Sequence, residues 1–160
     1  MRFYYPNFSN DMWRIMGLLF FADKNHFVAD DGKHYRLDEL KTFLAGTGIA
    51  LYDTCTRIVR TKNTASDKDL LVVEQTDVKQ MLRKMPLCQA VVTAGQLATT
   101  LCCAQFEVST PKVGECATLS FEGRPLAIWR MPSSSRAYPL SVEKKAAFYQ
   151  LVFQHLSPNS

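Results

Sequence analysis

The sequence predicts an α/β fold with helices on both faces of a sheet. Segments with the helical spacing of apolar residues alternate with short apolar runs typical of strands. The clearest unit covers residues 88–106, where an apolar strand runs through Gly95 into an amphipathic helix. A strand that passes through a glycine turn into a helix is typical of parallel βα layers.

Each expected element follows from a local pattern. Helices are expected where apolar residues recur at intervals of three and four, over residues 11–21, 37–44, 77–85, 96–106 and 142–155. Strands are expected over residues 48–54, 88–95, 117–121 and 126–130, and the last two form a hairpin. Polar and charged side chains predict loops over residues 25–35 and 57–68.

Length and composition predict one globular domain over residues 1–160. An apolar share of 47% and a charged share of 21% suit a packed core, which excludes a disordered or fibrous chain. The longest apolar run, residues 15–22, is much shorter than a membrane span, and the start lacks the pattern of a signal peptide. We therefore expect a cytoplasmic protein without a membrane segment.

The five cysteines form no recognisable metal or disulfide pattern. An odd number without a secretion signal favours reduced thiols, and no pair has the C-x-x-C spacing. The adjacent Cys102 and Cys103 point in different directions on any regular element, so they are poor joint ligands for one metal. The formal net charge of +4 is compatible with a nucleic-acid partner and equally with solubility alone.

A loop late in the sequence has side chains that suit phosphate binding. Residues 131–139 contain Ser133, Ser134, Ser135 and Arg136. Hydroxyls, backbone N–H groups and a guanidinium are the groups that hold phosphate oxygens. The ordinary alternative is a serine-rich surface turn.

Two further segments carry aromatic, amide and acidic groups. The aromatic residues within 3–13 suit stacking on a base, and their ordinary alternative is core packing. Asn10 in this segment is also a common helix cap. Asp53 ends the strand expected over residues 48–54 and suits a general base or a group that orients water, with a loop hydrogen bond as its alternative.

Taken together, the segments resemble the uracil-DNA glycosylase superfamily, in the branch near the hypoxanthine-DNA and mismatch-specific glycosylases. Residues 4–13 (YYPNFSNDMW) are similar to the family segment Tyr-Tyr…His-Pro-x-Asn-x-Phe-Trp, without its histidine. Residues 48–53 (GIALYD) resemble the family strand that ends in an acidic residue, and residues 91–96 (VVTAGQ) resemble the strand, turn and helix that follow. Residues 131–136 (MPSSSR) resemble the late motif, His-Pro-Ser or Leu-Pro-Ser-Thr-Ser.

The resemblance covers nearly the whole chain but not the first family motif. Family members carry an earlier strand and a glycine-rich loop that lines the catalytic pocket, ahead of the aromatic segment. Neither has a counterpart in the 160 residues. We therefore expect the pocket wall of this chain to be incomplete.

The resemblance implies a DNA glycosylase of base excision repair, which hydrolyses the N-glycosidic bond of a deaminated base such as uracil or hypoxanthine. It implies a three-layer α/β/α fold with a central, mainly parallel four-stranded sheet. It implies no metal or cofactor, and a monomer that binds DNA with a damaged or mismatched base. The roles implied are catalysis for Asn10 and Asp53, base stacking for Tyr4, Tyr5 and Phe8, and DNA binding for Ser133, Ser134, Ser135 and Arg136.

Two other functions stay open. The first is a non-catalytic nucleic-acid-binding or interaction domain that keeps the fold. The second is an α/β enzyme that acts on a nucleotide or another small molecule. Release of a base from DNA distinguishes the glycosylase from the first alternative, whereas polar groups that converge on a free base or phosphate favour the second.

Overall fold

The computed structural model describes residues 10–47, 49, 55–60, 70–75 and 77–156. The chain forms two compact units, one from Met1–Leu51 with Met131–Ser160 and one from Tyr52–Arg130. Each unit has its own helices, and the expectation of one domain over residues 1–160 stays a prediction.

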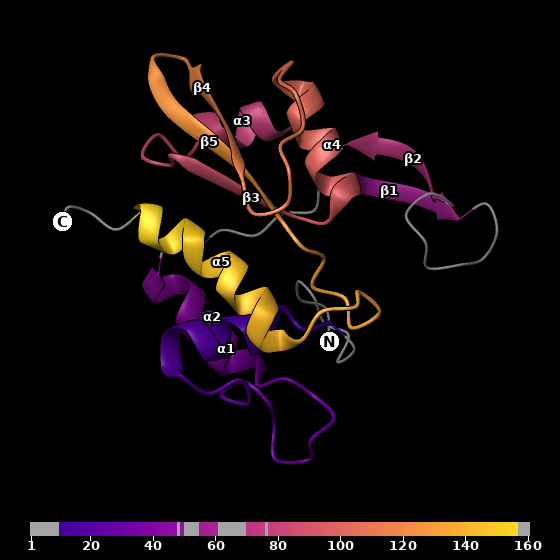
Figure 1. Cartoon of the computed structure of the whole chain (residues 1–160), viewed down its shortest axis with the longest axis vertical. Helices are drawn as coiled ribbons and strands as arrows, with labels where there is room; N and C mark the ends of the chain where they lie inside the picture. Colours follow the sequence, from indigo (N-terminus) through magenta and orange to yellow (C-terminus); the bar gives the residue numbers. More distant parts are fainter. Residues whose placement is uncertain (1–9, 48, 50–54, 61–69, 76, 157–160) are drawn as a thin grey trace. The chain divides into compact units, whose positions relative to one another are not determined.

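The described part of the first unit is built on helices α1 (Met12–Phe21), α2 (Leu37–Thr47) and α5 (Val142–Leu156), shown in Figure 1. The sequence predicted all three, although α2 extends to Thr47, beyond the expected end at residue 44. α1 packs directly against α5, because each buries an apolar face in a shared core. The large, fully buried side chains of this core are Trp13, Ile15, Phe27, Leu40, Tyr149 and Val152.

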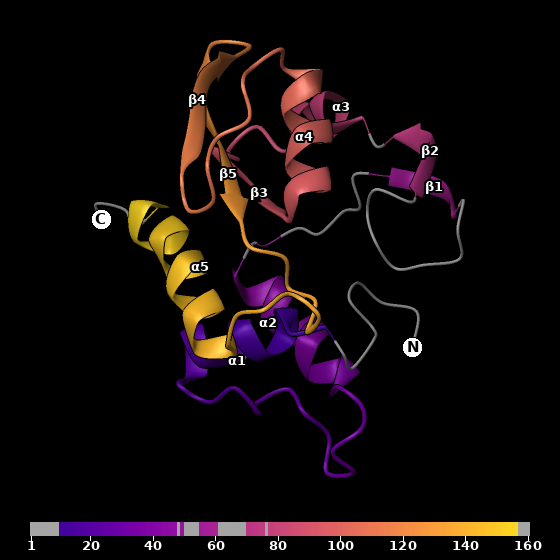
Figure 2. The ribbon, with the colours of Figure 1, turned by 45° about the vertical axis from the view of Figure 1, so that its right-hand side comes forward.

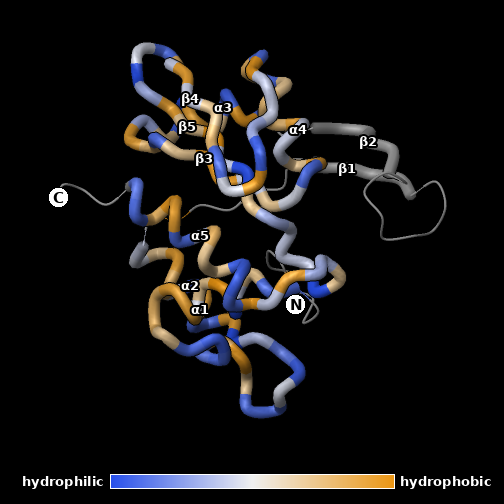
Figure 3. Tube along the Cα trace, in the orientation of Figure 1, coloured by the Kyte–Doolittle hydropathy of each residue, from blue (hydrophilic) through white to orange (hydrophobic). Residues whose placement is uncertain are grey.

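The connection between α1 and α2 also contributes to this core. Figure 3 shows that most of it is hydrophilic, as expected for a loop. Phe27 and Tyr35 within it are nevertheless only 1% and 5% exposed, so the loop is anchored by its two aromatic rings. Gly17 lets the connection fold back over α1, because a Cβ there would lie 2.5 Å from the carbonyl oxygen of Asp23.

The described part of the second unit contains two sheets. β1 (Cys55–Arg60) and β2 (Leu70–Gln75) form an antiparallel pair. β3 (Ala90–Ala94), β4 (Cys116–Phe121) and β5 (Arg124–Met131) form a mixed sheet in the order β3-β5-β4. Its helices are α3 (Val78–Arg83) and α4 (Gln96–Gln105).

α3 and α4 cover the same face of the three-stranded sheet, as Figure 2 shows. The buried side chains between the helices and the sheet are Val78, Leu82, Cys102, Cys103, Phe121, Leu126 and Ile128. The predicted strand, turn and helix are confirmed in β3 and α4, which are joined by Gly95 at φ +96°. Few residues other than glycine adopt that backbone conformation.

The predicted hairpin is also confirmed, with a tighter turn than expected. β4 and β5 are antiparallel, and Phe121 pairs with Arg124 across a two-residue connection. Both connecting residues, Glu122 and Gly123, have positive φ. A two-residue turn of this kind matches the twist of the flanking strands.

Two expectations about strands differ from the structure. Residues 57–68 were expected to be a charged loop, but β1 includes residues 57–60. The β-branched residues in this segment favour a strand, although the arginines beside them are typical of a solvent-exposed loop. Within the described residues, the larger sheet has three strands and includes an antiparallel pair. The mixed α/β class is therefore confirmed, whereas a four-stranded parallel sheet with helices on both faces is not shown.

The strand expected over residues 48–54, which ends in Asp53, lies outside the described residues except for position 49. None of the described helices combines the length and the apolar character that crossing a membrane requires.

Candidate functional site

The segment before α1 meets the serine-rich loop before α5. Asn10 and Ser135 form an antiparallel β-bridge. The backbone N–H of Asp11 donates a hydrogen bond of 2.6 Å to the carbonyl oxygen of Ser134. Two segments with predicted functions, separated by more than a hundred residues in the sequence, are therefore direct neighbours within the first unit.

The Asn10 side chain supports the start of α1. Its Oδ1 accepts a hydrogen bond of 2.9 Å from the backbone N–H of Met12. This is the kind of structural role that the sequence left open for an asparagine ahead of a helix. An asparagine bound in this way presents its amide N–H₂ group as the donor to a ligand.

The serine hydroxyls stabilise their own loop. The Ser133 Oγ accepts from the N–H of Ser135, and the Ser135 Oγ accepts from the N–H of Ala137, both at 3.2 Å. Ser134 is buried at 3% exposure, whereas the side chain of Arg136 is 52% exposed. A hydroxyl that accepts one amide proton can still donate its own, so Ser133 and Ser135 keep a donor for a phosphate oxygen.

A buried carboxylate holds this arrangement together. Asp11 is 3% exposed, and its Oδ1 accepts from the Nη1 of Arg14 and from the Nε of Arg136, each at 3.2 Å. Its Oδ2 accepts from the Nζ of Lys145, also at 3.2 Å. We call these four residues the Asp11 cluster.

Lys145 ties the cluster to the serine-rich loop. It is fully buried, and its Nζ also donates a hydrogen bond of 2.8 Å to the carbonyl oxygen of Ser135. A buried ammonium group is stable only when it is paired and hydrogen-bonded. Lys145 therefore fixes the loop against α5 at the same point where Asp11 fixes it against α1.

Tyr35 completes the buried side of the cluster. Its hydroxyl accepts from the Nη1 of Arg14 at 2.7 Å and donates to the carbonyl oxygen of Asn10 at 2.5 Å. Burial raises the pKa of Tyr35, because the charged phenolate loses its hydration. The tyrosine thus stays neutral and keeps the proton that it donates to Asn10.

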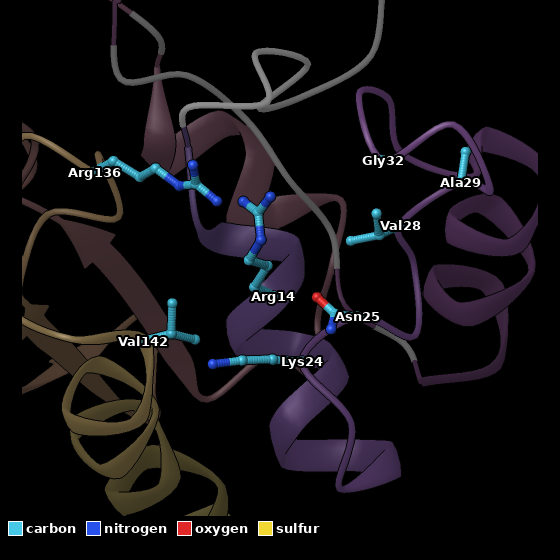
Figure 4. Close-up of a pocket in the computed structure, with 8 residues that line it drawn as sticks. All are labelled: Arg14, Lys24, Asn25, Val28, Ala29, Gly32, Arg136 and Val142. Carbon is cyan, nitrogen blue, oxygen red and sulfur yellow. The ribbon is translucent and has the colours of Figure 1, made fainter.

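A cavity of about 530 Å³ opens next to the cluster within the first unit. Figure 4 shows the guanidinium groups of Arg14 and Arg136 directed toward one another at one end, with Lys24 further along the wall. Asn25 adds an amide, and Val142 is among the apolar residues of the lining. No acidic residue is among the described residues that line this cavity.

Of the residues predicted for the site, the structure brings together Asn10, Ser133, Ser134, Ser135 and Arg136. The others, Asp53, Tyr4, Tyr5 and Phe8, lie outside the described residues.

Four residues of the site, Asp11, Arg14, Tyr35 and Lys145, were not predicted from the sequence. A signal was present for Lys145, because the buried residues Ala146, Tyr149 and Val152 place it on the apolar face of α5. A charged residue on such a face needs a buried partner. For Asp11 and Arg14 the spacing of three residues at a helix start was the available signal.

Comparison with protein-family models, curated proteins and solved structures finds no match for this chain. Among the described residues, no group of three or more His, Cys, Asp or Glu side chains is arranged to hold a metal ion. The cysteines whose side chains are described, Cys88, Cys102, Cys103 and Cys116, are free thiols.

Proposed function

We propose that this chain is a DNA glycosylase that removes a deaminated base, uracil or hypoxanthine, in base excision repair. The observation that carries the proposal is the β-bridge between Asn10 and Ser135. The resemblance implies that the segment of Asn10 contacts the base and that the loop of Ser135 contacts the DNA backbone. Both functions require the two segments to lie side by side, and they do so in the first unit.

The charge of the site supports a polyanionic partner. Arg14, Arg136 and Lys145 all pair with the carboxylate of Asp11, so three basic side chains gather beside the serine-rich loop. The half-exposed guanidinium of Arg136 is accessible to a phosphate, and guanidinium groups bind phosphate oxygens in pairs. In the proposal, Ser133, Ser134 and Ser135 position the backbone together with Arg136.

The proposed chemistry needs the target base outside the helix stack. An enzyme that acts on a base extrudes it, at a cost of a few kcal/mol for unstacking and unpairing. Tyr4, Tyr5 and Phe8 are proposed to stack on the extruded base, while the amide of Asn10 binds its edge or orients the attacking water. The N-glycosidic bond then breaks, the base leaves as an anion, and the sugar develops oxocarbenium character. Water adds to the anomeric carbon and loses a proton, and the departed base takes up a proton. Asp53 is the proposed carboxylate that stabilises this positive charge.

The remaining features of the proposal come from the resemblance. A mainly parallel four-stranded sheet in a three-layer α/β/α fold would include a strand over residues 48–54 and would place Asp53 at its carboxyl end. No metal or cofactor is required. The partner is DNA with a damaged or mismatched base, and the protein acts as a cytoplasmic monomer.

Base release from defined oligonucleotides tests the proposal. Single- and double-stranded oligonucleotides that contain one uracil or one hypoxanthine are incubated with the protein, and abasic sites are revealed by alkaline strand cleavage. The Asn10→Asp variant keeps an oxygen for the N–H of Met12 but loses the amide donor. We expect it to fold normally and to release base about 100–1000-fold more slowly, the usual effect of removing one positioned donor.

Two results would count against the enzyme. Salt-dependent DNA binding without any abasic sites would favour the non-catalytic nucleic-acid-binding domain. A protein that neither binds DNA nor releases a base would contradict both the glycosylase and the nucleic-acid-binding domain. Asp30→Asn, which changes a fully exposed carboxylate, is the matched control and should leave base release unchanged.

The cavity favours a second candidate, an α/β enzyme that acts on a nucleotide or another small molecule. Its volume of about 530 Å³ lies within the range of small-molecule sites, and Arg14, Lys24 and Arg136 converge on it. Turnover of free nucleotides by a protein that leaves uracil- and hypoxanthine-containing DNA intact would favour this candidate.

A further inference from the structure

We propose that β4 is a docking edge through which two copies of this chain pair, strand against strand, into one continuous sheet. The inference goes beyond the proposed function, because it concerns the second unit and needs none of the residues that are proposed to bind DNA. Pairing through one short strand buries little surface, so the proposed monomer predominates at low concentration. The inference therefore holds whether or not the protein releases a base.

β4 lies at an edge of its sheet and lacks the features that usually protect an edge strand. The sheet order is β3-β5-β4, so β5 pairs with one side of β4. Natural edge strands are usually protected by charged residues, proline or a bulge. The sequence of β4, CATLSF, contains no charged residue and no proline, and its pairing with β5 runs without a bulge from Cys116 to Phe121. The other side of β4 therefore suits the addition of a strand.

The hairpin turn determines which backbone groups of β4 point away from β5. In a hairpin with a two-residue turn, the pair next to the turn exchanges its backbone hydrogen bonds, and every second pair along the strands does the same. Phe121 is that first residue, and Ser120 after it faces Pro125, which has no N–H to donate. The backbone groups that point outward are those of Cys116, Thr118 and Ser120. In the described part of the chain, no backbone hydrogen bond from another segment reaches these three residues.

These outward groups define a register for two antiparallel copies of β4. A residue whose backbone points outward forms hydrogen bonds with another such residue. Within β4, a two-fold axis at Thr118 is the one that pairs all the outward residues, because it places Thr118 opposite itself and Cys116 opposite Ser120 of the second copy. Thr–Thr is a favourable cross-strand pair. Two-fold pairing is also closed, so it ends at a dimer.

The charges that flank β4 fit a second copy of the same strand. Glu115 precedes the strand and Glu122 follows it, and in this register they face Phe121 and Gly114 of the second copy. Like charges directly opposite each other would destabilise the pairing, and this register has none. Glu122 also has its own partner, Arg83, with 2.6 Å between the Nε and a carboxylate oxygen.

Pairing would also extend the apolar core of the second unit. Leu119 is half-buried and packs against the buried side chains between the sheet and its two helices. Ala117 points to the same face, because side chains alternate along a strand. At the joint, Leu119 of each copy lies opposite Ala117 of the other, so apolar surface at the edge of the core is removed from water. This contact favours a second copy over a hydrophilic peptide.

Disulfide cross-linking tests the register. A hydrogen-bonded antiparallel pair has its Cα atoms about 5.5 Å apart, a distance that suits a disulfide. Thr118→Cys should therefore form a covalent dimer through position 118 when it is oxidised with diamide, which takes up the two thiol hydrogens. Ser120→Cys should join to the native Cys116 of the second copy. The wild type should not join through Cys116, because the two copies of this residue are about 14 Å apart in this register.

Peptide mass spectrometry identifies the joined positions. Gln80→Cys places a thiol at an exposed position of α3, outside the sheet, and is the matched control that should not form a dimer. A covalent dimer of Thr118→Cys no more abundant than that of Gln80→Cys would overturn the proposal. Ser120→Cys joined to itself rather than to Cys116 would overturn the register.

Analytical ultracentrifugation over a wide range of concentrations measures the association itself. We expect a dimer that forms as the concentration rises. Thr118→Lys places two like charges opposite each other at the two-fold axis and should weaken the association about tenfold or more. Thr100→Lys, the same exchange at an exposed position of α4, should associate as the wild type does. Val92→Lys, on the opposite edge strand β3, should do the same. Circular dichroism shows that the variants are folded.

The results that would overturn the pairing are independent of base release. A wild type that stays monomeric at the highest soluble concentration would overturn it, as would a dimer that Thr118→Lys leaves intact. A dimer that is lost in Val92→Lys and kept in Thr118→Lys would assign the contact to β3. Base release by a protein without this dimer would keep the glycosylase and remove the docking edge.

Discussion

The ammonium group of Lys145, fully buried on α5, donates to the carboxylate of Asp11 at 3.2 Å, although 134 positions separate the two residues in the sequence. The pair joins the beginning of α1 to the beginning of the last helix. Between them lies the serine-rich loop, held by Lys145 through Ser135 and by Asp11 through Arg136. This buried ion pair is therefore one of the contacts that hold the proposed DNA-binding loop, together with the β-bridge between Asn10 and Ser135.

Removing the carboxylate of Asp11 should be strongly destabilising. Asp11→Asn keeps the shape of the side chain but leaves Lys145 buried without a counter-charge. We expect the free energy of unfolding to fall by about 3–5 kcal/mol, the usual cost of breaking a buried pair from one side. Urea denaturation measures this change.

Two comparison variants show whether the buried charge is the cause. Asp30→Asn removes a fully exposed carboxylate and should leave the free energy of unfolding unchanged within error. The double variant Asp11→Asn with Lys145→Met should recover part of the loss, because no ammonium group is then left unpaired. A double variant that is less stable than Asp11→Asn alone would contradict this account of the pair.

Tyr35→Phe should lower stability and change its dependence on alkaline pH. The variant loses a hydroxyl that serves Arg14 and Asn10, and we expect a cost of about 1–3 kcal/mol at neutral pH. Because burial raises the pKa of Tyr35 in the folded state, the unfolded state loses its proton first. The stability from Tyr35 is therefore fully present below the unfolded pKa of about 10 and is lost as the pH rises through the folded pKa.

Urea denaturation at a series of alkaline pH values measures this effect. The wild type should lose stability more steeply than Tyr35→Phe as the pH rises above that range. Identical slopes for the two proteins would show that Tyr35 does not titrate differently in the folded and unfolded states.

The buried thiol of Cys102 should react slowly with alkylating reagents. Burial, together with the neighbouring Cys103, raises the pKa of Cys102 to about 12, so the reactive thiolate is scarce at mildly alkaline pH. Cys88 is only half-buried and should be alkylated before Cys102. Peptide mass spectrometry after brief iodoacetamide treatment measures the order, and a urea-denatured sample should show no such difference. Equal labelling in the native protein would contradict the packing of α4.

Arg136→Ala should cost little stability. The guanidinium of Arg136 is half-exposed. When it is removed, Asp11 still has Arg14 and Lys145 as partners. Pairs that reach solvent contribute about 0–1 kcal/mol, so we expect a small shift of the melting temperature. A loss of stability as large as that of Asp11→Asn would assign Arg136 a structural role in place of a binding role.

The sequence was sufficient to predict the elements whose pattern is local. The periodicity of apolar residues located α1 and α5, and the run of β-branched residues with a glycine turn located β3 and α4. The hairpin of β4 and β5 followed in the same way. β1 was missed because charged residues interrupt its β-branched ones.

The site was harder to predict, because its contacts join distant parts of the chain. Asn10 and Ser135 form a β-bridge although they are far apart in the sequence, and no local pattern predicts this contact. The burial of Tyr35 inside a polar loop depends on Arg14, which lies on another element. Only Lys145 left a local signal, as a charged residue among the buried positions of α5.

The salt dependence of DNA binding tests the central claim, that the serine–arginine loop beside Asn10 holds the DNA backbone. Affinity for one oligonucleotide is measured at several salt concentrations for the wild type and for Arg136→Ala. Each lost phosphate contact should reduce the slope of log affinity against log salt by about 0.7–0.9. We predict weaker binding by Arg136→Ala together with such a reduced slope. The same affinity and the same slope in both proteins would contradict the claim.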